Sequence, residues 1–240
     1  SNTYYTHMNK LAVYTACIGN RSKLQEHTAS DLDTDYIAFL NPEPRREMET
    51  WDTHNGGLVT GHSFRQEPDW PRLTARCWKS SPHDVFPDHE YWLWIDGSMK
   101  LIKSPRDDIE KLMGDADLVG YQHPRRNCIY EEIKTCRGDR IETFQARDHL
   151  DVLDRCEKKY REEGMPENWG LIENGFLLRR NNAAIVEFNR LWTREIVETS
   201  TEDQMVMMYC LWKTGLKWKA LEGDATNNEY IEWAGHVGTR

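Results

Sequence analysis

Our fold prediction for this chain begins from the segment Tyr91-Trp92-Leu93-Trp94-Ile95-Asp96-Gly97. Five consecutive aromatic or apolar residues that favour extended backbone indicate a strand buried on both faces, as in a parallel sheet. The run stops abruptly at Asp96-Gly97, a typical turn sequence. Because open α/β sheets bind ligands at the carboxyl ends of their strands, we expect Asp96 to lie at the functional edge. The alternative is an Asp that only stabilises its own turn.

Elements on both sides of this strand follow an α/β order. Short β-prone runs predict strands, and capped or amphipathic segments predict helices. The predicted strands are Leu11–Ala16, Tyr36–Leu40, Tyr91–Ile95, Asp117–Tyr121 and Gly175–Arg179, and the predicted helices are Arg21–Ser30, Arg72–Ser80, Pro105–Met113, Ile141–Glu163, Ala183–Thr199 and Asp203–Thr214. Between them, residues 42–71 form a long surface excursion. We therefore predict one α/β domain over residues 11–240, with a mixed, mainly parallel sheet flanked by helices, after a lead-in or tag remnant at 1–10.

Composition restricts the class of protein. The 240 residues carry a formal net charge of −9, which excludes a surface that binds nucleic acid broadly. No apolar run is long enough to span a bilayer, and the N-terminus lacks the layout of a signal peptide. The six cysteines are scattered without CxxC pairs, so reduced thiols are expected rather than a zinc site or a disulfide scaffold. A cytoplasmic location is favoured, with a Golgi-type lumen as the alternative for an excised domain.

Basic residues precede the Trp-rich strand. Arg72, Arg76 and Lys79 are three and four residues apart, so on a helix they share one face. Arg76 and Lys79 are therefore candidates to bind a diphosphate. The alternative is an ordinary solvated basic face.

A second set of charged residues follows the strand that ends at Tyr121. Arg125 and Arg126 are candidates to bind an acceptor, together with Glu131 and Gln204. The alternative is that the arginines simply pair with the neighbouring glutamates.

Polar residues also stand beside two later elements. Glu173 and Asn174 precede an apolar strand, and Gly175 permits a close approach of the backbone. Asp203 begins a Met-rich helix, where it can cap the helix or act as a base. Glu173, Asn174 and Asp203 are the catalytic candidates, with turn formation and helix capping as the alternatives.

Two of the last five residues in the sequence have side chains that can bind ligands. The imidazole of His236 can complete a metal site that begins at Asp96, and the guanidinium of Arg240 can bind phosphate. A terminal tail without function is the alternative.

These segments together resemble a glycosyltransferase-like family, formerly catalogued as a domain of unknown function, with plant and bacterial members. The resemblance covers nearly all of residues 11–214 and rests on the order of six motifs. They are Tyr14-Thr15-Ala16-x-x-Gly19-Asn20, Arg76-x-x-Lys79-x-x-Pro82-His83-x-x-Phe86-Pro87, Trp94-Ile95-Asp96-Gly97, His123-Pro124-x-Arg126-x-Cys128-x-Tyr130-Glu131-Glu132, Gly170-Leu171-x-Glu173-x-Gly175 and Asp203-Gln204.

The resemblance implies a GT-A fold and a role in glycan biosynthesis. It places the nucleotide against Thr15, Ala16, Gly19 and Asn20, and the diphosphate near Asp96 and Gly97. Such enzymes commonly hold Mn²⁺ or Mg²⁺ with an Asp-x-Asp motif, but here Ser98 stands at the second position. The metal ligands implied are therefore Asp96, Ser98 and His236.

The predicted function is transfer of a sugar, hexosyl-like, from a UDP- or GDP-sugar to a glycan or other hydroxyl acceptor, assisted by a metal. Inversion and retention at the anomeric carbon both remain open. One alternative is a metal-assisted hydrolase with Asp96, His83 and His123 at the metal. Another is a non-catalytic glycan- or nucleotide-binding module in which exposed Trp51, Trp70 and Trp169 stack on sugars.

Overall fold

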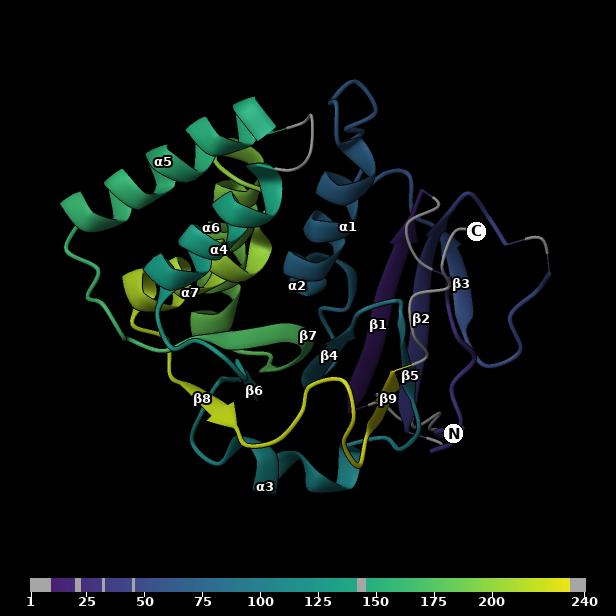
Figure 1. Ribbon diagram of the computed structural model, residues 1–240. Coiled ribbons are helices and arrows are strands. Elements are labelled where there is room, and N and C mark those ends of the chain that lie inside the picture. Colours follow the sequence, from purple (N-terminus) through teal and green to yellow (C-terminus); the bar gives the residue numbers. More distant parts are fainter. Residues whose placement is uncertain (1–9, 20–22, 32, 45, 142–145, 234–240) are drawn as a thin grey trace, which may run out of the picture.

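A seven-stranded sheet forms the centre of the computed structural model, which describes residues 10–19, 23–31, 33–44, 46–141 and 146–233 (Figure 1). In order across the sheet the strands are β3 (Asp52–Asn55), β2 (Thr34–Asn41), β1 (Leu11–Ile18), β4 (Tyr91–Ile95), β7 (Ile172–Arg180), β6 (Leu118–Gln122) and β8 (Trp218–Leu221). Only β7 runs antiparallel to its neighbours among these seven strands. The predicted mixed, mainly parallel sheet is confirmed, while the domain bounds 11–240 stay a prediction.

Helices cover the two faces of this sheet unequally (Figure 1). One face carries α1 (Trp70–Ser80), α2 (Pro82–Val85), α4 (Ile129–Ile141), α5 (Ala146–Glu162), α6 (Ala183–Glu198) and α7 (Asp203–Thr214). The other carries α3 (Ile109–Met113), after a 3₁₀ turn at Arg106–Asp108, and a small antiparallel sheet of β5 (Met99–Leu101) and β9 (Ile231–Trp233). Within the described ranges, no helix has the length and apolar character needed to cross a lipid bilayer.

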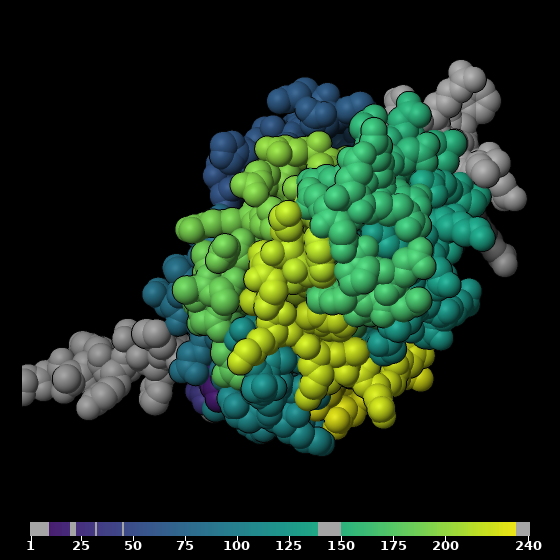
Figure 2. Space-filling model, turned by 90° about the vertical axis from the view of Figure 1, so that its left-hand side faces the viewer, coloured from purple at the N-terminus to yellow at the C-terminus, as the bar shows by residue number. Residues whose placement is uncertain are grey.

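Strand β1 contributes to the cores on both faces of the sheet. Its eight residues are all buried, with Ala12, Tyr14 and Ala16 facing the helical layer and Leu11 and Val13 facing the opposite core. This is the alternation expected of a strand covered on both sides. In the helical layer α5 lies beside α7, where Tyr160 stacks on Tyr209, and Figure 2 views the molecule from that side.

Several predicted bounds differ from the structure. The described residues 23–31 contain no helix, although Arg21–Ser30 was a candidate for one. The helix expected over residues 141–163 begins at Ala146, and α4 precedes it without having been predicted. Helix α7 has the predicted bounds, and Gly215 ends it in the left-handed conformation that favours glycine.

Strand β7 is irregular where it passes β6. Val119 lies opposite Leu178 and Tyr121 lies opposite Glu173, so four residues of β7 face the single residue Gly120 of β6. A Cβ atom at Gly120 would lie 2.8 Å from the backbone oxygen of Glu173, which explains the glycine. The extra residues of this bulge include Asn174 and Gly175, and Asn174 lies within the strand rather than before it as predicted.

Candidate active site

The carboxyl end of β4 and the amino end of β7 meet at one edge of the sheet. The backbone N–H of Asp96 donates to the carbonyl of Gly175 at 2.9 Å. A Cβ atom at Gly175 would lie 3.1 Å from Asp96 Oδ2 and 2.5 Å from the Met99 terminal methyl. The bulged part of β7 therefore approaches Asp96 closely, and the predicted site residues Asp96, Glu173 and Asn174 belong to the same edge of the sheet.

The Asp96 carboxylate is held through one of its oxygens. Asp96 Oδ1 accepts a hydrogen bond from Trp94 Nε1 at 2.8 Å and lies 3.5 Å from Lys79 Nζ. The side chain is 36% exposed, and no described residue donates to Oδ2. Trp94 was not among the predicted site residues, although residues two apart on a strand share a face.

Lys79 and Asp203 form a buried ion pair next to Asp96. Lys79 Nζ lies 2.9 Å from Asp203 Oδ2, which also accepts from Asn174 Nδ2 at 2.9 Å. Arg76 Nε lies 3.0 Å from Asp203 Oδ1, an ion pair whose N–H is not aligned for a hydrogen bond. The Lys79 side chain has no exposed surface, so it is not part of the solvated patch that the basic helix was expected to present. The predicted residues at 76, 79, 174 and 203 thus form one network.

The surroundings of Asp203 keep its carboxylate ionised. Burial alone would raise the pKa of Asp203, but Arg76, Lys79 and Arg72 overcome this effect and hold the pKa at about 2. Its side chain does not cap α7, because Glu202 occupies the N-cap position. A buried carboxylate with so low a pKa is a poor proton acceptor near neutral pH. Asp203 is therefore a fixed counter-ion in this structure rather than the base that the sequence suggested.

Side chains of β1 and β7 hold the end of α1 that carries Lys79. The Lys79 carbonyl accepts from Tyr14 Oη at 2.6 Å and from Arg179 Nη2 at 2.7 Å. Arg179 is fully buried, and it also donates to Asn189 Oδ1 at 2.7 Å. A guanidinium at the carboxyl end of a helix complements the helix dipole. Main chain and side chain of Lys79 are therefore both fixed, and the sequence analysis had assigned no role to Arg179.

Glu173 lies among negative charges, whereas Asp203 lies among positive ones. The partly buried side chain of Glu173 has a raised pKa, first because of burial and then because of the negative charges of Asp224, Glu132 and Asp96. The positive charge of Arg126 acts in the other direction. A raised pKa makes the Glu173 carboxylate a better proton acceptor than an ordinary exposed glutamate.

Arg126 and Glu132 form an ion pair close to Glu173. Arg126 Nε donates to Glu132 Oε2 at 2.7 Å, so the predicted alternative of a pairing with a neighbouring glutamate is confirmed for Arg126. Gln204 Nε2 lies 3.4 Å from Glu132 Oε1, which adds the start of α7 to this cluster. The two other predicted acceptor residues, Arg125 and Glu131, have exposed side chains.

The nucleotide residues implied by the resemblance are placed differently along β1. Thr15 and Ala16 are buried within the strand, because β1 continues through Ile18, two residues further than predicted. Thr15 has no exposed surface and Ala16 is 6% exposed, so their side chains offer little surface to a nucleotide. Gly19 follows the strand at the carboxyl edge with a φ of +70°, while Asn20 lies outside the described residues.

The tryptophans of the glycan-binding alternative do not form an exposed surface. Trp51 is 5% exposed and donates to the Gln25 carbonyl at 2.9 Å, which corrects the expectation that it is exposed. Trp70 is partly covered by the Arg65 guanidinium, and Trp169 packs against Trp218.

A divalent cation fits the described residues poorly. Hard cations prefer several oxygen ligands. In the described part of the chain, no group of three or more His, Cys, Asp or Glu residues is placed to hold a metal ion. Asp96 Oδ1 already faces the Lys79 ammonium, which would repel a second cation, and Ser98 adds only a hydroxyl. His236 and Arg240 lie outside the described residues.

The metal of the hydrolase alternative has no better support. His83 Nδ1 lies 3.3 Å from Asn189 Nδ2, and His123 Nε2 lies 3.0 Å from Arg126 Nη2. Both imidazoles are therefore engaged by other side chains rather than gathered around Asp96.

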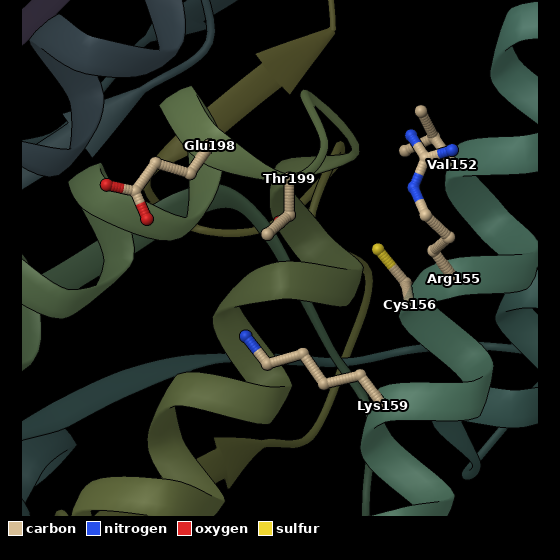
Figure 3. A pocket seen from close by; sticks show the side chains of 6 residues that line it. All are labelled: Val152, Arg155, Cys156, Lys159, Glu198 and Thr199. Atoms are coloured by element: carbon tan, nitrogen blue, oxygen red, sulfur yellow. The ribbon is translucent and has the colours of Figure 1, made fainter.

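A hollow of about 230 Å³ lies between α5 and α6 (Figure 3). Cys156 and Lys159 point into it from α5, while the Glu198 carboxylate turns away (Figure 3). Lys159 Nζ lies 2.8 Å from both carboxylate oxygens of Glu195. None of the predicted site residues lines this hollow, so it is separate from the network around Asp96.

Comparison with known proteins identifies the family. The sequence matches the family model "TOD1/MUCI70, glycosyltransferase-like domain" over residues 67–223, about two thirds of the chain and the part that contains Arg76, Asp96, Glu173 and Asp203. No curated protein sequence matches the chain.

Two solved structures are among those that align with the chain. Mouse xyloside xylosyltransferase 1 in its apo form has 9% identity and a TM-score of 0.48, over 88% of this chain and 84% of that one. The apo bifunctional glycosyltransferase WbbM has 7% identity and a TM-score of 0.51, over 92% of this chain and 40% of that one. At these identities the likeness concerns the fold alone. The chain belongs to the TOD1/MUCI70 family of glycosyltransferase-like domains and has the GT-A fold.

Proposed function

We propose that the chain transfers a sugar from a UDP- or GDP-sugar to a hydroxyl group of a glycan or other acceptor. One observation carries the proposal: a carboxylate with a raised pKa, Glu173, lies at the same sheet edge as the Arg76–Asp203–Lys79 network. A group transfer of this kind needs a proton acceptor beside a site for an anionic leaving group. The family and the fold support the reaction class.

The donor diphosphate would bind at Arg76, next to Asp96 and Gly97. The Arg76 side chain is 24% exposed and its Nε lies 3.0 Å from Asp203, so its two terminal nitrogens are proposed to bind a phosphate. The buried Lys79 acts indirectly, because it holds Asp203 and Asp96 in place. Gly19, at the end of β1, is proposed to contact the nucleotide, and the contact predicted for Asn20 stays a prediction.

Glu173 would act as the base. Its carboxylate takes the proton of the acceptor hydroxyl, and the acceptor oxygen then forms a bond to the anomeric carbon. The bond from that carbon to the phosphate oxygen breaks, and the nucleoside diphosphate leaves with the electron pair. A single displacement of this type inverts the anomeric centre. Arg125, Arg126, Glu131 and Gln204 are proposed to contact the acceptor.

Mn²⁺ or Mg²⁺ stays a prediction in this scheme, and no step above depends on either ion. Hexosyl specificity likewise stays a prediction, which a panel of donors tests. The release of nucleoside diphosphate should require a sugar nucleotide and increase when an acceptor is added, with the sugar recovered on that acceptor.

Glu173→Gln tests the assignment of the base. We expect turnover to fall about 100-fold or more while the affinity for the nucleoside diphosphate is retained, since the amide cannot accept the proton. Glu187→Gln, an exposed glutamate of α6, is the control for the same chemical change. Full turnover in Glu173→Gln would contradict the assignment, and sugar release without a nucleotide donor would favour the hydrolase.

A further inference from the structure

We infer that the chain binds the diphosphate of its donor without a divalent metal, with Arg76 as the cation and with Asp96 neutralised internally by Lys79. The inference rests on the proposed function and specifies how its donor is held. It departs from the metal-assisted reaction that the sequence suggested.

The position of Lys79 supplies the first argument. Its ammonium lies 2.9 Å from Asp203 Oδ2 and 3.5 Å from Asp96 Oδ1, and its side chain has no exposed surface. An ammonium without exposed surface is poorly screened by solvent, so it interacts strongly with both carboxylates. A divalent ion at Asp96 would have to bind next to this fixed positive charge, whereas an anionic ligand next to Asp96 meets a carboxylate that is already compensated.

The hydrogen bonds of Asp96 supply the second argument. Trp94 Nε1 donates to Oδ1 at 2.8 Å, so this oxygen already has two donors. The indole is buried in strand β4 and cannot turn away without disturbing the core. Only Oδ2 is left for a ligand, and one carboxylate oxygen is a small part of the coordination that Mn²⁺ or Mg²⁺ prefers.

Arg76 is the partly exposed cation of the network. Its Nε lies 3.0 Å from Asp203 Oδ1, and this ion pair holds the guanidinium beside the buried carboxylate. The two terminal nitrogens form a fork that matches two phosphate oxygens. Because Asp203 is buried and also held by Lys79 and Asn174, the guanidinium is positioned before any ligand binds.

Calorimetric titration with UDP and GDP tests the inference directly. The full chain is titrated once with EDTA present and once with excess Mn²⁺. We expect one of the nucleotides to bind in EDTA, with a Kd within about threefold of the value in Mn²⁺. Arg76→Gln should weaken binding in EDTA by about tenfold or more, because it removes a charge-assisted hydrogen bond. Arg155→Gln, at the hollow between α5 and α6, is the matched control.

Asp96→Asn distinguishes a site that holds the anion with Arg76 from a site that holds it with a metal ion, because the two predict opposite changes in affinity. With inorganic pyrophosphate as the probe, in EDTA, the substitution should tighten binding by about threefold, because it removes a negative charge next to the anion. An asparagine oxygen still accepts from Trp94, so the local geometry is kept. If Asp96 were a metal ligand, the same variant would instead lose a Mn²⁺-dependent part of the affinity.

The outcomes distinguish the inference from the function on which it rests. Binding in Mn²⁺ but not in EDTA would overturn the metal-free site and leave the transferase proposal intact. Binding of neither nucleotide in either condition would overturn both. An unchanged affinity in Arg76→Gln, with a normal thermal unfolding curve, would remove Arg76 from the site.

Discussion

Two carboxylates at one edge of the sheet have opposite surroundings. Asp203 faces Arg76, Lys79 and the Asn174 amide, and its pKa falls to about 2. Glu173, the residue before Asn174, has a raised pKa among the carboxylates of Asp224, Glu132 and Asp96. The bulge in β7 separates the two environments, because Asn174 turns toward α7 while Glu173 lies opposite Tyr121 of β6.

This difference shows why residue type alone does not assign a catalytic role. Both side chains are acids at the same edge, and both were candidates for the base from the sequence. A carboxylate that is held by two cations organises its neighbours, whereas one among like charges can exchange a proton. Substitutions at the two carboxylates should therefore change the free energy of unfolding, and its dependence on pH, in different ways.

Asp203→Asn should produce the largest effect. It removes the charge that compensates the fully buried Lys79, and breaking one partner of a buried ion pair costs about 3–5 kcal/mol. The free energy of unfolding from urea titration measures the loss. Asp154→Asn, which breaks an exposed pair with Arg137, should cost about 1 kcal/mol or less.

A double variant identifies the cause of that loss. Because Lys79→Met removes the uncompensated ammonium, Lys79→Met/Asp203→Asn should lose less stability than the sum of the single variants. Strictly additive losses would show that the pair is not the source of the effect.

The pH dependence of stability should differ in sign between the two carboxylates. Asp203 has a pKa of about 2 in the folded chain against an ordinary 3.8, so its ionised form favours folding. That contribution, about 2 kcal/mol, is present above pH 4 and is lost as the pH falls toward 2. Glu173 has a raised pKa, so its contribution is present below the ordinary value and is lost as the pH rises through the folded pKa.

Urea unfolding across the acid range measures both slopes. The stability difference between the unmodified chain and Asp203→Asn should shrink below pH 4. The difference between Glu173→Gln and the unmodified chain should instead grow in favour of the variant as the pH rises above 4.5. Parallel curves for all three proteins would contradict the contrast between the two regions.

The edge of the sheet was predictable because it depends on local sequence. The apolar run Tyr91–Ile95 and the abrupt change at Asp96 together place a carboxylate at the end of a buried strand. Helices α6 and α7 were predictable for a similar reason, since each has a long apolar segment and a clear start or stop. Helix α4 was missed because its buried residues Ile129 and Ile133 lie in its first turns and no apolar stripe continues along it.

The internal arrangement of the site was not predictable from local patterns. The spacing of Arg76 and Lys79 placed them on one helix face but did not reveal that this face packs against Asp203. The bulge in β7 depends on the register with β6, which the sequence of either strand does not show. Arg179 lies within an apolar strand, and its contact with the Lys79 carbonyl depends on how α1 packs on the sheet.

Gly175→Ala should produce the smallest effect and tests how closely the two regions approach each other. The new Cβ atom would lie 2.5 Å from the Met99 terminal methyl, which can move, and 3.1 Å from Asp96 Oδ2, which must then shift by a few tenths of an ångström. We expect a stability loss of about 1 kcal/mol and a several-fold weaker affinity for UDP or GDP. Gly138→Ala in α4, where a Cβ atom meets nothing within 4 Å, should instead be neutral or stabilising. An unchanged nucleotide affinity in Gly175→Ala would mean that the position of Asp96 does not limit binding, because the carboxylate is the only charged group that this methyl group displaces among the described residues.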